Sequence, residues 1–84
     1  MIRLTLLSRP GCHLCEEMRR EVDVLLAGQP HEWDVVNVDS DPDLLLRYGD
    51  SIPVLFVNGR LFAKIRLPRF TSKVRLRKAT SASL

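Results

Sequence analysis

The spacing of apolar residues changes along the chain, and the first change separates a strand from a helix. Residues 2–7 form a short apolar run that is typical of a β-strand. From Cys12 onward the apolar positions recur every three or four residues, which predicts an amphipathic helix. Gly28 and Pro30 are expected to end this helix. The stripe that we expect to face the core consists of Leu14, Met18, Val22 and Leu25.

The next segment returns to strand spacing and then predicts a short helix. Residues 32–39 are rich in valine and predict a second strand. Ser40 or Asp41 can cap a following helix, in which Pro42 suits the first position and Gly49 suits the end. The residues expected to pack this helix are Leu44, Leu45 and Tyr48.

A β-hairpin follows the second helix. Residues 52–57 predict a third strand, which the chain enters through Pro53. Asn58-Gly59 is a strong signal for a two-residue hairpin turn, and it leads into a fourth strand over residues 60–67. On this strand we expect strict alternation between two faces, with one face carrying Leu61, Ala63 and Ile65 and the other carrying Phe62, Lys64 and Arg66.

The last expected element is a helix that begins at Pro68, with Phe70 and Val74 facing inward, before a flexible C-terminal tail over residues 80–84. The order of elements is therefore β-α-β-α-β-β-α. A helix that crosses over between the first two strands makes them parallel, and the hairpin adds an antiparallel pair. We predict an α/β fold in which helices flank a four-stranded mixed sheet, as one domain over residues 1–79.

The composition is that of a small folded protein. The 84 residues, 45% of them hydrophobic, allow one domain. No apolar run approaches the roughly 20 residues of a membrane span, and the first run is too short for a secretion signal. Two cysteines also cannot form a disulfide scaffold. From these three observations together we expect a cytoplasmic protein without membrane association. In a reducing compartment a close cysteine pair is more often catalytic or metal-binding than structural.

Charge is divided unevenly along the chain. All ten acidic side chains lie in residues 1–59, whereas eight of the 13 basic side chains lie in residues 60–84. Arg69, Lys73 and Arg77 form a row of like charge on the last predicted helix. This basic C-terminal face predicts either a solvated surface or a site for an anionic partner. Because we expect no exposed aromatic residues among these charges, and no known nucleic-acid-binding fold, we do not expect specific nucleic-acid binding.

The motif that points to a chemistry is Cys12-His13-Leu14-Cys15, where the first strand runs into the first helix. A cysteine in the first turn of a helix faces unpaired backbone N–H groups and the positive end of the helix dipole, which both favour the thiolate. Cys15 lies about one turn further on, close enough to attack a mixed disulfide formed at Cys12. His13, when protonated, would favour the Cys12 thiolate further, or else it is a surface residue without a role. Leu14 is expected either to pack or to face a substrate.

Other functions of the cysteine pair stay open. A structural disulfide would close a small ring and contribute only about 2 kcal/mol. A zinc ion needs about four ligands, and the only histidines beside the cysteines are His13 and His31. A metal ion or cluster shared by two chains is a further alternative. Thiol–disulfide exchange needs neither, so for that function we expect no metal and no bound cofactor.

The chain resembles the glutaredoxin-like proteins of the thioredoxin-fold superfamily from residue 2 to about residue 67. Three features carry the resemblance in the same order along the chain: Cys12-x-x-Cys15 at a strand-to-helix turn, Ile52-Pro53 at the entry to a strand, and the Asn58-Gly59 hairpin. The stretch from Ser8 to Cys15 is also similar to the Ser-Arg-Pro-Gly-Cys-His-Leu-Cys stretch of short bacterial-type members. The resemblance implies a thioredoxin-like fold of the glutaredoxin type.

The resemblance also implies roles for single residues near the motif. Cys12 would be the nucleophile and Cys15 the resolving thiol. Arg9 takes the place of a basic residue, usually lysine, three positions before the nucleophile. It would bind a carboxylate of the substrate and help to hold the thiolate.

A second segment, Ser51-Ile52-Pro53, stands where the family has Thr-Val-Pro. Pro53 matches the cis-proline of the family, which would place the backbone of Ile52 beside the cysteines to pair with a substrate's backbone. A cis bond before proline costs far less than any other cis bond, so the arrangement is physically reasonable.

Departures from the family pattern concern glutathione. His13-Leu14 replaces the usual Pro-Tyr, so the tyrosine contact is absent. Arg66-Leu67 stands where the family has an acidic pair that anchors the amino group of glutathione, and a guanidinium there would repel that ammonium. The chain carries no dinucleotide-binding fingerprint. We therefore expect the electron donor to be either glutathione or a separate NADPH-dependent reductase.

The sequence predicts a monomeric thiol–disulfide oxidoreductase that reduces protein or glutathione mixed disulfides through Cys12 and Cys15. The first alternative is a redox-sensing or adaptor domain that binds an anionic partner at the basic C-terminal face. The second is a glutaredoxin-like protein that binds a metal or an iron–sulfur cluster, without general disulfide-reductase turnover.

Overall fold

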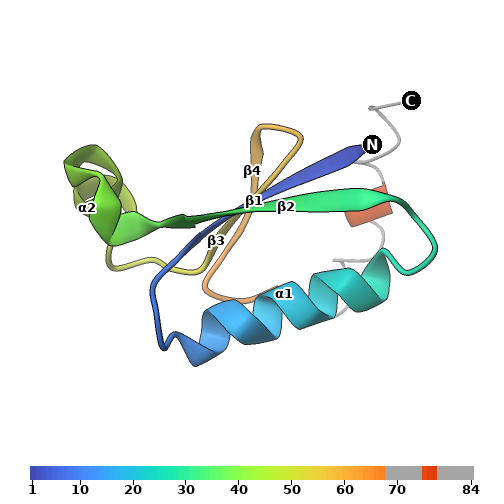
Figure 1. The fold of residues 1–84 in the computed structure, drawn as a ribbon, viewed down its shortest axis with the longest axis horizontal. Helices are drawn as coiled ribbons and strands as arrows, with labels where there is room; N and C mark the ends of the chain where they lie inside the picture. Colours follow the sequence, from blue (N-terminus) through green and yellow to red (C-terminus); the bar gives the residue numbers. More distant parts are fainter. Residues whose placement is uncertain (68–74, 78–84) are drawn as a thin grey trace.

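The structure is a computed structural model, and it describes residues 1–67 and 75–77. Within these residues the elements follow one another as the apolar spacing predicts (Figure 1). They are β1 (Ile2–Ser8), α1 (His13–Leu25), β2 (His31–Asn37), the 3₁₀ turn η1 (Val38–Ser40), α2 (Pro42–Tyr48), β3 (Val54–Val57) and β4 (Arg60–Lys64). Residues 75–77 are helical, whereas the expected inward-facing Phe70 and Val74 and the expected tail over residues 80–84 lie outside the described residues.

The strands form one four-stranded mixed sheet in the order β2-β1-β3-β4. The first two strands are parallel, with Ile2 opposite His31 and Ser8 opposite Asn37. Both β1 with β3 and β3 with β4 are antiparallel. This confirms the predicted sheet, because α1 is the crossover between β1 and β2 and Asn58-Gly59 is the turn of the hairpin. None of the helices among the described residues is long and apolar enough to cross a membrane.

The core lies between one face of the sheet and α1. Figure 1 shows α1 running along the sheet and α2 at one end of it. The most deeply buried residues of this core include Leu4, Leu6, Met18, Val22, Leu26 and Leu55. Burying a leucine or valine side chain stabilises the folded state by about 1.5–3 kcal/mol. This packing therefore fixes α1, and with it the cysteine motif at its first turn.

The buried stripe of α1 is shifted by one position from the predicted one at its start. It runs through Cys15, Met18 and Val22 and continues into Leu26. Leu14 is 37% exposed, so the expectation that it belongs to the core is wrong. A step of one residue turns a helix by about 100°, which moves Leu14 off the face on which Cys15 is buried.

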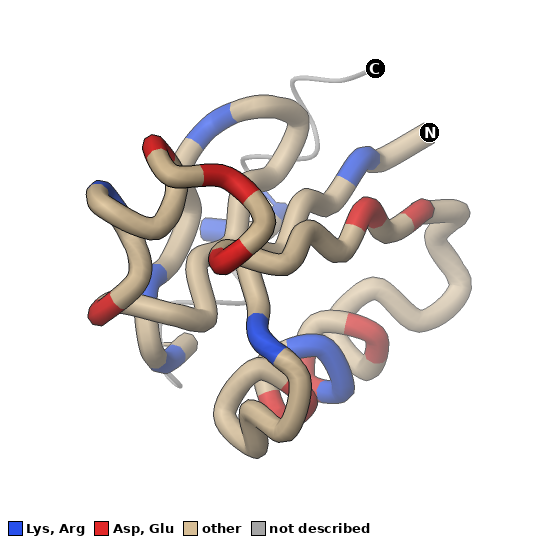
Figure 2. Tube along the Cα trace, turned by 60° about the vertical axis from the view of Figure 1, so that its left-hand side comes forward, with Lys and Arg blue, Asp and Glu red and all other residues tan. Residues whose placement is uncertain are grey.

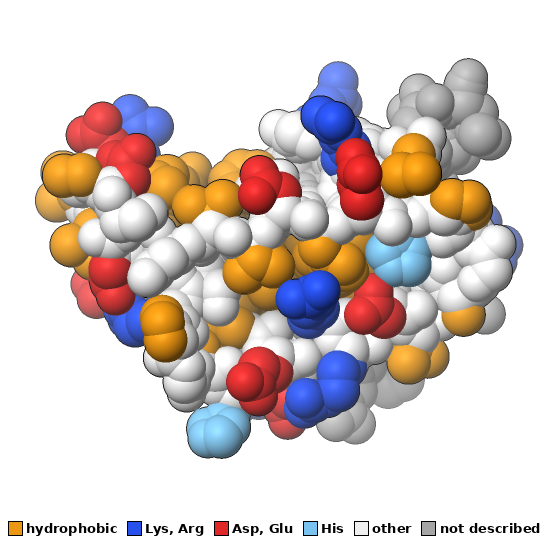
Figure 3. All heavy atoms as spheres, in the orientation of Figure 1, with side chains coloured by type: hydrophobic (Ala, Val, Ile, Leu, Met, Phe, Trp, Pro, Cys, Tyr) orange, Lys and Arg blue, Asp and Glu red, His pale blue; other side chains and the backbone are white. Residues whose placement is uncertain are grey.

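The second strand ends two residues earlier than predicted, whereas the second helix has the predicted bounds, from Pro42 to the residue before Gly49. Asn37 ends β2, because its side chain accepts a hydrogen bond from the N–H of Asp39 and starts the turn η1. Asp41, not Ser40, caps α2 by accepting from the N–H of Asp43. Leu45 was expected to pack but is 45% exposed, because a helix of seven residues buries only part of its surface. Figure 3 shows hydrophobic side chains gathered on the end of the molecule formed by α2.

The strict alternation predicted for the fourth strand is also wrong. Leu55 lies opposite Ala63 and Phe56 lies opposite Leu61, so Phe62 is an extra residue in β4. Such a bulge brings neighbouring residues to one side of the strand, and both Phe62 and Ala63 are buried. The strand ends at Lys64 rather than at residue 67.

Charged residues of both signs lie next to one another over much of the described chain. Figure 2 shows acidic and basic positions interspersed along α1. Of the basic row predicted on the last helix, Arg69 and Lys73 lie outside the described residues, and Arg77 is exposed. An anionic partner at the basic C-terminal face therefore stays a prediction.

Candidate active site

Cys12 and Cys15 are joined by a disulfide at the first turn of α1, and their Cα atoms are 5.3 Å apart. After β1 the chain turns at Gly11, which has a φ of +79°, a value that glycine adopts without steric cost. The Cys12 N–H donates to the carbonyl of Arg9 at 3.2 Å, which closes this turn. Cys12 is half-buried and Cys15 is 2% exposed. An attacking disulfide or thiol therefore reaches Cys12 before Cys15.

Cys12 is the N-cap residue of α1. Its sulfur accepts a hydrogen bond from the backbone N–H of Cys15 at 3.2 Å, in the position where most helices place an oxygen of serine, threonine, aspartate or asparagine. In the reduced protein the same N–H and the positive end of the helix dipole would lie beside the Cys12 sulfur. Both favour a negative charge there, so the cap position promotes the thiolate.

The peptide bond between Ile52 and Pro53 is cis, as the family resemblance implies. Pro53 is buried at the start of the segment that leads into β3, and its carbonyl accepts a hydrogen bond from the N–H of Ile65 at 2.7 Å. Ile52 is half-buried and packs, like Cys12, against the core cluster that contains Cys15. Ser51 is half-buried, and its N–H donates to the carbonyl of Tyr48 at 2.8 Å.

Arg9 forms a two-pronged ion pair with Asp39. Its Nε and Nη2 donate to the two carboxylate oxygens of Asp39, each at 2.8 Å. The hydrogen bonds from Arg9 hold the pKa of the Asp39 carboxyl below its ordinary value. The family resemblance implies that this guanidinium binds a carboxylate of the substrate, whereas in the structure it binds a carboxylate of the same chain. The predicted parallel pairing of β1 with β2 could have indicated this ion pair. The pairing ends with Ser8 opposite Asn37, so the residues that follow each strand, Arg9 and Asp39 among them, lie at the same edge of the sheet.

His13 and Leu14 are both exposed on the first turn of α1. Of the two expectations for Leu14, the structure supports a surface position, since it lines a groove rather than the core. In the described part of the chain, no group of three or more histidine, cysteine, aspartate or glutamate residues could hold a metal ion.

A second polar cluster, which the sequence analysis missed, lies near the far end of α1. Asp23 accepts hydrogen bonds from Trp33 Nε1 and His31 Nε2, each at 2.8 Å. The other ring nitrogen of His31 lies 2.8 Å from the carbonyl oxygen of Gln29. The Gln29 carbonyl and the Asp23 carboxylate both favour the protonated ring and raise the pKa of His31. Partial desolvation opposes ionisation of Asp23, but the hydrogen bonds from Trp33 and His31 outweigh it and lower its pKa.

Comparison with known proteins gives a family for the chain. Residues 3–79 match the model of the glutaredoxin-like domain (DUF836). The solution NMR structure of protein Ne2328 from Nitrosomonas europaea is 31% identical to the chain, with a TM-score of 0.74 over 90% of this chain and 89% of that one. No match was found among curated proteins.

Two thioredoxins share the fold at lower identity. A mutant thioredoxin from Halobacterium salinarum NRC-1 is 20% identical, with a TM-score of 0.58 over 94% of this chain and 74% of that one. The oxidized form of mitochondrial thioredoxin 3 from Saccharomyces cerevisiae is 17% identical, with a TM-score of 0.55 over 96% of this chain and 77% of that one. The chain therefore belongs to the glutaredoxin-like family and has the thioredoxin fold.

Proposed function

We propose that the protein is a thiol–disulfide oxidoreductase that reduces disulfides through Cys12 and Cys15. The observation that carries the proposal is the disulfide between these residues at the N-cap of α1. Cys15 is shielded and Cys12 is half-buried, which is the division that an attacking and a resolving sulfur require.

The reaction proceeds by two exchanges between sulfur atoms. The Cys12 thiolate attacks a substrate disulfide, forms a mixed disulfide with one substrate sulfur and expels the other as a thiolate. The Cys15 thiol gives up its proton and attacks Cys12, which releases the second substrate thiolate and leaves the Cys12–Cys15 disulfide. The substrate gains two electrons, and the cysteine pair loses them. A dithiol reductase or two molecules of glutathione must return these electrons before the next cycle.

The segment before β3 supplies a place for the backbone of the substrate. In the part of the chain that the structure describes, neither the N–H nor the carbonyl of Ile52 is paired. We propose that these groups pair with the backbone of a polypeptide disulfide, as an added strand pairs with a sheet edge. Ser51 and Pro53 hold Ile52 in place on either side.

The experiment that tests the proposal compares two cysteine variants with the unchanged protein. Cys12→Ser is expected to abolish exchange with a disulfide substrate, because the only other thiol of the chain, that of Cys15, is buried. Cys15→Ser is expected to keep the first exchange and to accumulate a mixed disulfide at Cys12, which mass spectrometry detects. Retained turnover in Cys12→Ser would contradict the proposal.

The electron donor is a separate part of the proposal. We propose a cytoplasmic, reducing setting, with glutathione or a separate NADPH-dependent reductase as donor. Recycling of the oxidised protein by glutathione alone is compared with recycling by NADPH and a thioredoxin-reductase-type enzyme. Because Arg66 is expected to repel the ammonium of glutathione, the reductase should recycle the protein faster. Faster recycling by glutathione would reverse this assignment and leave the exchange chemistry in place.

The alternative of a redox-sensing or adaptor domain depends on the basic C-terminal face, whose Arg69 and Lys73 lie outside the described residues. It stays a prediction, and binding of an anionic partner that changes with the oxidation state of Cys12 and Cys15 would test it.

A further inference from the structure

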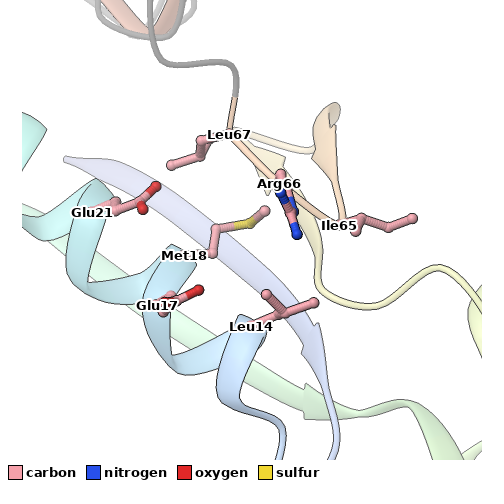
Figure 4. A pocket seen from close by; sticks show the side chains of 7 residues that line it. All are labelled: Leu14, Glu17, Met18, Glu21, Ile65, Arg66 and Leu67. Carbon is pink, nitrogen blue, oxygen red and sulfur yellow. The ribbon is translucent and has the colours of Figure 1, made fainter.

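A groove of about 280 Å³ lies between α1 and the segment that follows β4, and Leu14 of the cysteine motif lines it. Figure 4 shows its two walls. The residues of α1 that line it are Leu14, Glu17, Met18 and Glu21, and the opposite wall is formed by Ile65, Arg66 and Leu67. Met18 and Leu67 are buried beneath the groove, whereas the other five residues are exposed.

Both walls of the groove are continuous with the redox site. Leu14 stands between Cys12 and Cys15 in the chain, at the first turn of α1. On the other wall, the N–H of Ile65 donates to the carbonyl of Pro53 at 2.7 Å, next to Ile52. A polypeptide that pairs with Ile52 and presents a sulfur to Cys12 would therefore carry its neighbouring side chain past this groove.

The backbone at Ile65 is strained. Its φ is +68°, and the N–H of Arg66 donates to the carbonyl of Lys64 at 2.6 Å, which makes a three-residue turn around Ile65. A β-branched residue rarely adopts a positive φ. The turn leaves the Ile65 side chain 44% exposed at the groove instead of in the core. Strain of this kind is concentrated at functional sites, where the surrounding structure maintains it.

The groove has an excess of negative charge. Glu17 and Glu21 are one helical turn apart, and Figure 4 shows their carboxylates projecting from α1 toward the opposite wall. Among the described residues neither carboxylate has an ion-pair or hydrogen-bond partner, and the Arg66 side chain has none either. Like charges four residues apart on a helix destabilise it slightly, so a cation held between the two carboxylates would relieve their repulsion.

We propose that this groove selects disulfide substrates in which a lysine or arginine flanks the reacting cysteine of a polypeptide. The aliphatic stem of the basic residue lies against Leu14 and Ile65, and its cationic end lies between Glu17 and Glu21. Arg66 limits the attraction, because its positive charge partly offsets the two carboxylates. The inference rests on the proposed exchange function and adds a substrate class to it.

The test uses two capped tripeptides, acetyl-X-Cys-X-amide, each as a mixed disulfide with 2-thiopyridine. X is lysine in one peptide and norleucine, which has the same stem without the ammonium, in the other. Attack by the Cys12 thiolate joins the peptide sulfur to Cys12 and expels pyridine-2-thione, whose absorbance gives the rate. At low ionic strength we expect the lysine peptide to react about three- to tenfold faster than the norleucine peptide. The advantage should shrink in high salt.

Charge variants make the test specific to the groove. Glu17→Gln and Glu21→Gln should each lower the ratio of the lysine rate to the norleucine rate, whereas Arg66→Gln should raise it. A purely structural role would not give these opposite signs. Glu32→Gln is the matched control, because this carboxylate lies on β2 in an ion pair with Arg3 and should leave the ratio unchanged.

The outcomes separate the inference from the proposed function. A ratio of one, or a ratio that Glu17→Gln and Glu32→Gln change alike, overturns the inference while reaction of both peptides upholds exchange at Cys12. If neither peptide reacts, the proposed function fails, and the inference fails with it.

Discussion

The two ends of α1 carry polar groups in opposite situations. Near the end of the helix, Asp23 accepts hydrogen bonds from both His31 and Trp33, so this cluster is satisfied from within the chain. At the first turn, the Cys12 sulfur accepts one N–H, and along the helix between Cys12 and Asp23 the carboxylates of Glu17 and Glu21 have no partner among the described residues. Satisfied groups fasten one element to another, whereas groups left without partners are available to a substrate. The same helix thus serves stability at one end and chemistry at the other.

A substitution of Asp23 is the most direct test of this difference between the two ends of α1. Asp23→Ala should lower the free energy of unfolding by about 1–2 kcal/mol, because Trp33 Nε1 and His31 Nε2 both lose their acceptor. Chemical denaturation measures the loss, and the rate of exchange at Cys12 should not change. Asp34→Ala, the same change at an exposed position of β2, serves as control. An exchange rate that falls in Asp23→Ala but not in Asp34→Ala would show that the two ends of the helix are coupled.

Substitutions at the strained turn of Ile65 test the role of the groove. Ile65→Gly removes both the side chain and the strain, whereas Ile65→Ala removes the side chain and keeps a Cβ at the positive φ. The glycine variant should therefore be about 1 kcal/mol more stable than the alanine variant. Both should react more slowly than the unchanged protein with the lysine peptide, since both lose the apolar wall. Equal stability of the two variants would mean that the backbone at this position is not strained.

The parts that the sequence predicted depend on neighbours in the chain. Cys12 as the cap of a helix, Pro42 at the first position of α2 and Asn58-Gly59 as a hairpin turn are each fixed by a few adjacent residues. The cis bond before Pro53 came from a family resemblance, and the structure confirms it. These features sufficed for the order of elements and the mixed sheet.

The parts that the sequence did not predict depend on the register between strands. Phe62 is recognised as an extra residue only when β4 is paired with β3. The strained turn at Ile65 comes directly after the end of β4 that this register sets. The ion pair of Arg9 with Asp39 and the contact of Asp23 with His31 join residues that lie far apart in the sequence or on different elements. No local propensity reports such contacts, so the polar environment of the candidate site became visible only in the folded chain.

The ion pair between Arg9 and Asp39 shares a feature with each end of α1. Its charged groups are paired within the chain, as at Asp23, but Arg9 lies close to Cys12 in the sequence. If Arg9 acts by holding the turn before Cys12 through Asp39, then Arg9→Ala, Asp39→Ala and the double variant should slow exchange by the same factor, about two- to threefold. If Arg9 binds a substrate carboxylate instead, Arg9→Ala should have the larger effect and raise KM for acidic substrates. The double-mutant cycle, measured as kcat and KM for one peptide disulfide, separates the two roles.

The smallest expected effect is the pH dependence of the satisfied cluster. The pKa of His31 is raised from its ordinary value of 6.5, so its contribution to stability is complete below that pH and is lost as the pH rises through the folded-state pKa. The pKa of Asp23 is lowered from 3.8, so its contribution is present above that pH and is lost as the pH falls through the folded-state pKa. The pair should therefore stabilise the protein most between about pH 4 and 6.5. His31→Gln should lower Tm in this window and have less effect at pH 8, where the unchanged protein also carries less charge at this position. Thermal unfolding of both proteins across the range tests this, and a Tm difference that is the same at pH 5.5 and pH 8 would show that His31 acts through its packing alone.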